Sequence, residues 1–315
     1  MAPIAGTLAG SGALPGKLKA IGLLKFETTV GYFDRPRGDV NNPGLLLMDM
    51  RWSPSPWFEA GATRLSMFGG EGRPMPSIGQ LILPTDPHVT DDPDKELPDQ
   101  NELASLDFRG TLPVAKILGG PVKWVEAYWQ YGAEDMIVLH LGEVPYPSLA
   151  GVANTYGLET RVGPVTMTVE RSRIFDDYFR WYLGHRVYHE GFTQDGLVIG
   201  HHAGGDSMSW WAEAAWMPDQ ELTLVGVTGH ARISLSYEEI YRVGIIESFN
   251  DNLLALAQDE QSHTLTAVGA WQGPRLGLEL AYTVQIIDGE GFVPGASDVK
   301  HRVYLAASYR GSLSK

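Results

Sequence analysis

The sequence predicts an all-β protein, an antiparallel transmembrane β-barrel of about 12–18 strands with long extracellular loops. Three observations predict it. Apolar and polar residues alternate strictly in many segments, several of these segments are longer than ordinary strands, and helical periodicity is almost absent. A soluble antiparallel sheet with one packed face also alternates, and it is the main competing interpretation.

The stretch from Arg275 to Ile287 shows the pattern best. Leu276, Leu278, Leu280, Tyr282, Val284 and Ile286 fall on one side of an extended chain, and polar or small residues fall on the other. Soluble strands average about 5–6 residues, whereas a tilted membrane-spanning strand needs about 9–11. The length therefore favours a strand that crosses a bilayer.

The same alternation recurs along the chain and predicts about a dozen strands. The alternating segments are 24–32, 46–52, 106–109, 125–131, 156–162, 165–170, 207–216, 264–272, 276–286 and 302–310, and the segments 57–68 and 220–234 predict strands with mixed faces. Ile240, Val243 and Ile246 have the spacing of a short helix within Tyr237–Gln258, which is equally compatible with a loop between strands.

Charge placement favours lipid over a packed core. The apolar faces of the alternating segments carry no Lys, Arg, Asp or Glu, and a basic residue facing lipid at the midplane costs about 2–4 kcal/mol. Aromatic residues near the segment ends predict an interfacial girdle. These residues are Tyr32, Trp52, Tyr131, Trp216, Trp271 and Tyr309.

Composition excludes several classes of function. The 315 residues carry a net charge of −14, which argues against a nucleic-acid partner, because a phosphate backbone requires a basic surface. The chain has no cysteine and therefore no thiolate metal site, and it has no run of 18 apolar residues that could form a transmembrane helix. We expect a single domain over residues 1–315, with residues 1–20 disordered or belonging to a truncated N-terminal segment.

The longest irregular stretch runs from Gly69 to Gln100 and is predicted to be a long loop. It holds six prolines, and acidic residues dominate its second half, with Lys95 as the opposing base. Loops of this length are usually functional or disordered. The acids could bind calcium, but they lack the ordered spacing of an EF-hand, and a solvated loop is the simpler reading.

Two glycine-rich clusters are the candidate sites. In Gly69-Gly70-Glu71-Gly72-Arg73, Glu71 and Arg73 could bind sugar hydroxyls or pair with each other across a turn. In Gly200–Ser207, His201, His202 and Asp206 suggest a metal site or a hydrolase. Adjacent histidines point to opposite faces of a strand, however, and neighbours in sequence rarely form a triad, so a tight polar turn is favoured there.

The chain also resembles the Wzi capsule-assembly family. The resemblance rests on Gly44–Trp52, Trp57–Arg64 and Phe68–Pro74, on Asp99–Arg109 after the acidic loop, and on Gly191–Phe192 with Ile199–Asp206. These blocks follow the family's order and spacing, and the Gly-Gly-Glu-Gly-Arg-Pro block is the most specific. The family's barrel has eighteen strands and a helical bundle near its start, a pattern that this sequence does not show.

The resemblance implies an outer-membrane barrel that binds capsular polysaccharide and helps to attach or assemble the capsule without catalysis. It makes Glu71, Arg73, His201 and Asp206 candidates for glycan binding or loop folding. We expect a monomer in the bacterial outer membrane with polysaccharide and lipid as partners, no catalytic residue, no cofactor, and no assigned metal. A porin for small solutes is the alternative, and a membrane hydrolase that uses His201 and Ser207 is the third possibility.

Overall fold

The computed structural model describes residues 4–13, 22–82, 100–141, 144–175, 181–182, 187–194, 197–224, 226–243, 245–246, 255–256 and 259–310. Across these ranges the chain consists mainly of antiparallel strands, as predicted. The helices are short, and they are α1 (Ile78–Ile82), α3 (Val114–Leu118) and the 3-10 turn η2 (Glu290–Phe292). No helix in the described ranges is both long and apolar enough to cross a bilayer.

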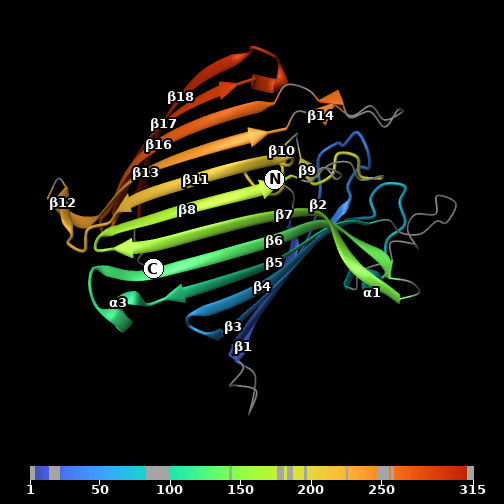
Figure 1. The fold of residues 1–315 in the computed structure, drawn as a ribbon, viewed down its shortest axis with the longest axis horizontal. Coiled ribbons are helices and arrows are strands. Elements are labelled where there is room, and N and C mark those ends of the chain that lie inside the picture. The colour runs from blue at the N-terminus through green and yellow to red at the C-terminus, as the bar shows by residue number, and fades with distance from the viewer. Residues whose placement is uncertain are drawn as a thin grey trace, which may run out of the picture. The chain divides into compact units, whose positions relative to one another are not determined.

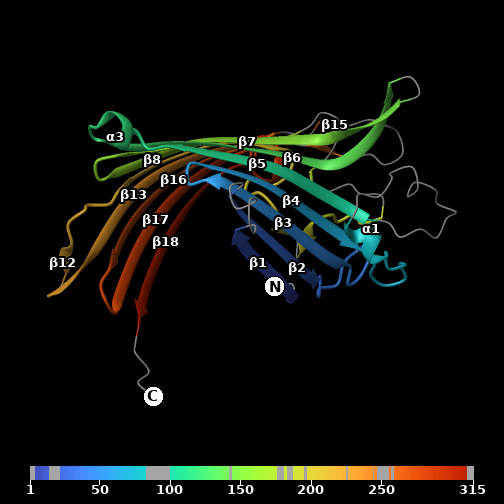
Figure 2. The same cartoon turned by 90° about the horizontal axis from the view of Figure 1, so that it is seen from below.

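Within the described ranges fourteen strands form one sheet (Figures 1 and 2), in the order β1-β2-β3-β4-β5-β6-β7-β8-β11-β13-β16-β17-β18, with β12 beside β13. The strands of this path follow one another in sequence order, some through short turns and others, such as β4 to β5 and β8 to β11, through long connections. The strand number agrees with the prediction of about 12–18. The strands are β1 (Ile4–Ala13), β2 (Leu23–Tyr32), β3 (Gly44–Ser55), β4 (Phe58–Phe68), β5 (Gln100–Leu112), β6 (Val122–Leu141), β7 (Val144–Val162), β8 (Val165–Ile174), β11 (Ser207–Trp216), β12 (Leu222–Leu224), β13 (Val227–Arg242), β16 (Glu260–Gln272), β17 (Leu276–Asp288) and β18 (Ser297–Tyr309).

Two small hairpins lie outside this sheet. One pairs β9 (Thr193–Gln194) with β10 (Leu197–Val198), and the other pairs β14 (Ile245–Ile246) with β15 (Ala255–Leu256). The chain forms two compact units. Unit 1 comprises residues 1–110, 128–155 and 173–206, and unit 2 comprises residues 111–127, 156–172 and 207–315. Strands β5 to β8 contribute residues to both, and the single domain over 1–315 stays a prediction.

In unit 2 the predicted alternation is seen in β16, β17 and β18, and β13, predicted over 220–234 as a strand with mixed faces, joins their apolar row. The register pairs Ile233 with Gly269, Gly269 with Leu280, and Leu280 with Leu305, so these residues form one row across β13, β16, β17 and β18. Leu280 is 53% exposed on this apolar face, whereas Ser234, one residue along from Ile233, is buried on the polar face. A soluble core would reverse this exposure.

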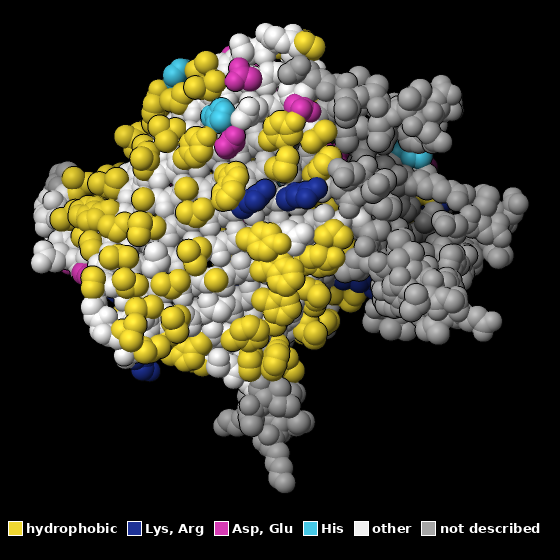
Figure 3. Space-filling view, viewed as in Figure 1, with side chains coloured by type: hydrophobic (Ala, Val, Ile, Leu, Met, Phe, Trp, Pro, Cys, Tyr) yellow, Lys and Arg dark blue, Asp and Glu magenta, His cyan; other side chains and the backbone are white. Residues whose placement is uncertain are grey.

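Large apolar side chains remain exposed along most of the apolar face, and Figure 3 shows hydrophobic side chains spread widely over one side of the strands. Tyr32, Trp52, Trp216 and Tyr309 are exposed, as a girdle position requires. Tyr131 is half-buried. Trp271 departs furthest, because it is only 8% exposed and its indole N–H donates to the Leu222 carbonyl 3.2 Å away. The girdle prediction is wrong for Trp271, since β12 supplies a hydrogen-bond partner that the alternation pattern does not indicate.

Unit 1 carries a core at one end of its strands. The polar face of β3, β4 and β5 turns apolar there, through Leu45, Leu65, Met67 and Leu103. Aromatic residues from the loops pack against these side chains and complete a cluster that contains Phe33, Trp181, Tyr182, Tyr188 and Phe192. The loops are therefore held by hydrophobic burial on the polar face of the sheet.

Three predicted segments, Tyr237–Gln258, 69–100 and 1–20, differ in part from what the structure shows. The helical interpretation of Tyr237–Gln258 is wrong for Tyr237–Arg242, which continues β13, because pairing with β11 and β16 outweighs the local spacing. The predicted loop 69–100 contains α1, and its residues 83–99 lie outside the described residues. Ile4–Ala13 forms β1, whereas residues 1–3 and 14–21 lie outside the described part.

Candidate functional site

Three loop segments of unit 1 are tied together, and we call residues 33–43, 69–73 and 187–194 the loop cap. Its strongest tie is a buried ion pair between Arg37 and Asp39, whose side chains are 3% and 1% exposed. Arg37 Nε lies 2.8 Å from Asp39 Oδ1, and Nη2 lies 3.0 Å from Oδ2. The same guanidinium donates to the carbonyls of Gly191 and Thr193 at 3.0 and 2.7 Å.

The carboxylate of Asp39 is a second anchor for residues 187–194. It accepts the backbone N–H of Glu190 at 2.8 Å and that of Val40 at 2.6 Å. Burial by itself raises the pKa of Asp39, but the hydrogen bonds from Arg37, Glu190 and Val40 together lower it below its ordinary value. The pair is therefore ionised at neutral pH and links residues that are about 150 positions apart in sequence.

The predicted residues Glu71 and Arg73 lie on the exposed side of this cap. The backbone N–H of Glu71 donates to the Asn41 carbonyl at 2.8 Å, and the Asn41 side chain donates to Glu71 Oε2 at 3.2 Å. Gly70 makes this contact possible, because its φ is +102° and a Cβ there would lie 2.5 Å from Val40. The turn thus presents Glu71 and Arg73 to solvent on a fixed backbone.

Three glycines leave the space in which Trp181 and Tyr182 pack beneath the loop cap. A Cβ on Gly132 of β6 would lie 3.0 Å from the Trp181 ring. A Cβ on Gly205 would lie 2.3 Å from the Trp181 carbonyl oxygen, and one on Gly200 would lie 2.4 Å from the Tyr182 ring. The glycines at 200 and 205 therefore allow close packing of an aromatic pair.

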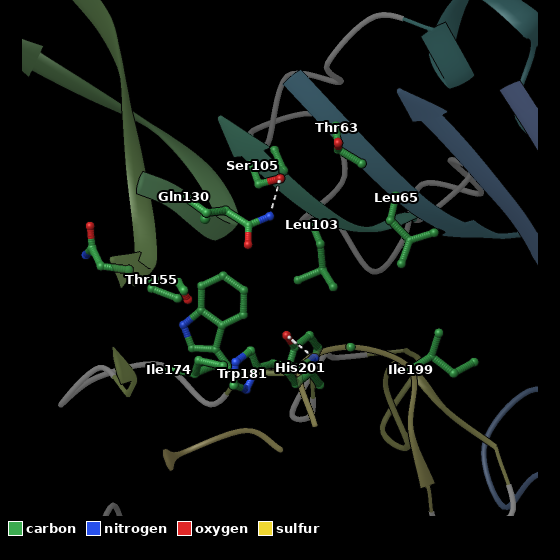
Figure 4. A pocket seen from close by; sticks show the side chains of 16 residues that line it. Thr63, Leu65, Leu103, Ser105, Gln130, Thr155, Ile174, Trp181, Ile199 and His201 are labelled. Carbon is green, nitrogen blue, oxygen red and sulfur yellow. Dashed lines mark hydrogen bonds between the residues drawn. The ribbon is translucent and has the colours of Figure 1, made fainter. Parts of the chain in front are cut away.

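A pocket of about 360 Å³ lies between this aromatic pair and the strands of unit 1. In Figure 4 the Trp181 indole points from the 181–182 segment toward Gln130, which donates to Ser105 Oγ at 3.5 Å. The remaining lining is apolar or neutral and polar. It consists of Thr63, Leu65, Leu103, Ala104, Gly132, Ala153, Asn154, Thr155, Ile174, Tyr182, Ile199, Gly200 and His201. Such a mixture is typical of small-molecule sites.

The pocket contains one of the four predicted site residues, His201. Its backbone N–H donates to the Tyr182 hydroxyl at 3.1 Å, and its ring Nδ1 accepts the backbone N–H of Ala203 at 3.2 Å. The ring lies 4.3 Å from that of His202. Burial raises the pKa of Tyr182 above its ordinary value, so this hydroxyl stays protonated at neutral pH.

Asp206 does not line the pocket. It is buried at the start of β11 with a φ of +53°, in the left-handed region that few residues adopt. Ser207 beside it is 1% exposed and does not line the pocket. Among the described residues, no group of three or more His, Asp or Glu is placed to hold a metal.

The sequence interpretation missed Trp181, Tyr182 and Gln130. Gln130 was visible as a polar-face residue of a predicted strand, but nothing marked it as part of a pocket. Trp181 and Tyr182 fall between two alternating segments, and their adjacency was the one available signal. The structure brings His201 together with these three residues and places Glu71 and Arg73 on the exposed turn of the cap.

Comparison with known proteins identifies the family. The family model described as capsule assembly protein Wzi matches residues 12–225, which include the loop cap and every residue of the pocket. None of the curated proteins compared with the chain matches it.

The fold is similar to a solved structure described as Wzi, an outer-membrane protein involved in group 1 capsule assembly in Escherichia coli and a carbohydrate-binding β-barrel. The TM-score is 0.61 at 18% sequence identity, and the match covers 94% of this chain and 58% of that one. This likeness confirms the predicted β-barrel fold class. Since the family model matches more than half of the residues of this chain, the chain belongs to the Wzi capsule assembly protein family.

Proposed function

We propose that this protein is an outer-membrane β-barrel that binds surface polysaccharide and takes part in attaching or assembling the capsule. The observation that carries the proposal is the pocket of unit 1, where Trp181 and Tyr182 stand among neutral hydrogen-bonding groups. Aromatic rings offer an apolar surface beside a polar handle, which suits a sugar ring with its C–H face and hydroxyl groups. Family membership and the carbohydrate binding named for the similar E. coli protein support it.

The exposed apolar face supports a membrane location. Its rows of leucine, isoleucine and valine would leave a large apolar surface in water, whereas lipid would cover them at no such cost. We therefore propose outer-membrane lipid as the second partner of the protein, beside the polysaccharide. We propose that the barrel acts as a monomer.

The four predicted residues take different proposed roles. His201 lies in the pocket and contacts the glycan, while Asp206 is buried and holds the turn that carries His201. Glu71 and Arg73 are exposed on the cap and offer a separate contact for charged sugar units. We propose binding without catalysis, because Ser207, the nucleophile of the hydrolase alternative, is buried and lies outside the pocket lining.

The loop cap also favours binding over the channel alternative. Its aromatic residues occupy the polar face of β3, β4 and β5, where a solute path would need water. The cap is held by the buried Arg37–Asp39 pair, and this favours a rigid platform over a gate.

The test is affinity electrophoresis of the full chain in detergent, through gels that contain capsular polysaccharide from a group 1 strain. Dextran gels serve as the control. Retardation by the capsular polysaccharide alone supports the proposal, and equal mobility in both gels contradicts it. Conductance in planar bilayers without glycan retardation would favour the porin alternative.

A further inference from the structure

We propose that the pocket beneath the loop cap binds an uncharged sugar unit of the polysaccharide, with an oxygen of that unit accepting the Trp181 indole N–H. This inference rests on the proposed function and narrows it. Neutral sugar units would occupy the pocket, while acidic sugar units of the same polysaccharide would remain outside it.

The indole N–H of Trp181 is the first argument. Trp181 is 4% exposed, and within the described part of the chain its Nε1 atom is buried with no hydrogen-bond partner. A buried donor without an acceptor costs about 1–3 kcal/mol, and native structures rarely leave one unsatisfied. An oxygen of a bound sugar would supply the acceptor.

The position of the indole is the second argument. Gly132 leaves room for the ring against β6, so the ring stands upright and points toward Gln130 (Figure 4). Ser105, Gln130 and Thr155 add hydroxyl and amide groups to the same pocket. These groups both donate and accept, as do the hydroxyl groups of a sugar.

The third argument is that the pocket lining has no acidic side chain, lysine or arginine. A carboxylate or phosphate brought into the pocket would lose water without gaining an opposite charge, which is costly. A hexose without a charged substituent avoids this cost. The volume of about 360 Å³ also lies in the range of roughly 300–1,000 Å³ of small-ligand sites.

The experiment follows the indole N–H signals of tryptophan by NMR in the full chain, labelled with ¹⁵N-tryptophan and reconstituted in nanodiscs. The Trp181 signal is assigned by its loss in Trp181→Phe. Trp271 is the matched control, because its indole N–H already donates to the Leu222 carbonyl at 3.2 Å and it lies in unit 2, outside the pocket lining. The probes are the methyl glycosides of glucose, galactose and mannose, each compared with glucuronic acid.

We expect the Trp181 signal to shift with at least one methyl glycoside, and the Trp271 signal to stay in place. Glucuronic acid should shift the Trp181 signal much less. Gln130→Met, which keeps Trp181, should weaken the binding of that glycoside by roughly tenfold, as expected for a lost hydrogen bond. Trp181→Phe should weaken capsular polysaccharide binding by a similar factor, and Trp271→Phe should leave it unchanged.

Two results would overturn the inference while leaving the proposed function standing. One is a Trp181 shift with glucuronic acid as large as that with the glycosides. The other is a Trp181 signal that no glycoside moves, in a protein whose polysaccharide binding survives Trp181→Phe. Loss of all polysaccharide binding in the unaltered chain would instead refute the proposed function itself.

Discussion

Replacing Asp39 by asparagine should release residues 187–194 from the loop cap. The carboxylate of Asp39 accepts two hydrogen bonds from Arg37 and one each from the backbone of Glu190 and Val40. Asparagine keeps the shape of the side chain but removes the charge, and it places an amide group where an acceptor is needed. Arg37 would then remain buried without its counter-ion.

The size of the effect follows from that burial. With side chains 3% and 1% exposed, the pair is screened very little by water. Removing one partner of a buried pair costs ~3–5 kcal/mol, which corresponds to roughly 100- to 5,000-fold in the equilibrium for local opening. Most of that cost should appear in the cap, because Arg37 and Asp39 contact residues 190–193 directly.

The assay is hydrogen–deuterium exchange of peptides that cover residues 187–194, with the protein in nanodiscs. Exchange there should accelerate by about two orders of magnitude or more if local opening controls it. Asp219→Asn is the matched control. Asp219 also faces two cations, Lys123 and Arg161, but it is 67% exposed, and such pairs contribute only about 0–1 kcal/mol.

Exchange in 187–194 that changes by less than threefold in Asp39→Asn would refute this reasoning. So would an equal effect of Asp219→Asn on the same peptides. Either result would mean that hydrophobic packing of Tyr188 and Phe192 holds the segment and that the ion pair adds little.

Three further predictions follow from the same structure. The pKa of Asp39 is lower in the folded state than its unfolded value of about 3.9. The stability that the Asp39 carboxylate gives the loop cap is therefore full above that pH and is lost as the pH falls through the folded pKa. Hydrogen exchange of residues 187–194, corrected for intrinsic rates, should stay constant from pH 7 to 5 and accelerate below pH 4. Gly205→Ala should perturb the NMR signal of the Trp181 indole N–H, since its Cβ would meet the Trp181 carbonyl at 2.3 Å, and an unmoved signal would argue against this seating. Leu280→Arg on the apolar face should destabilise the membrane-inserted protein by ~2–4 kcal/mol if the site is at the midplane. The measurement is the temperature at which the gel mobility of the protein shifts in SDS, and this temperature should fall. Gln285→Arg on the polar face should change this temperature little.

The strands were predictable because their cause is local. A side chain on a strand points to one face or the other with a period of two, so the rows of β16, β17 and β18 can be read directly from the order of residues. The segment Tyr237–Arg242 shows where this fails, because its spacing also fits a helix and only pairing with two neighbouring strands decides the matter. Trp271 shows the same limit, since its burial depends on β12.

The sequence by itself determined the all-β architecture, the exposed apolar face and the two glycine-rich clusters. The resemblance to the Wzi family also made His201 a candidate, together with Glu71, Arg73 and Asp206, and of these four the structure places His201 in the pocket. The tertiary structure alone decided that Gly132, Gly200 and Gly205 seat Trp181 and Tyr182, and that Gln130 meets them across a pocket. Those residues come from separate strands and loops, so the site exists only after long-range packing has brought them together, and no periodicity along the chain records that packing.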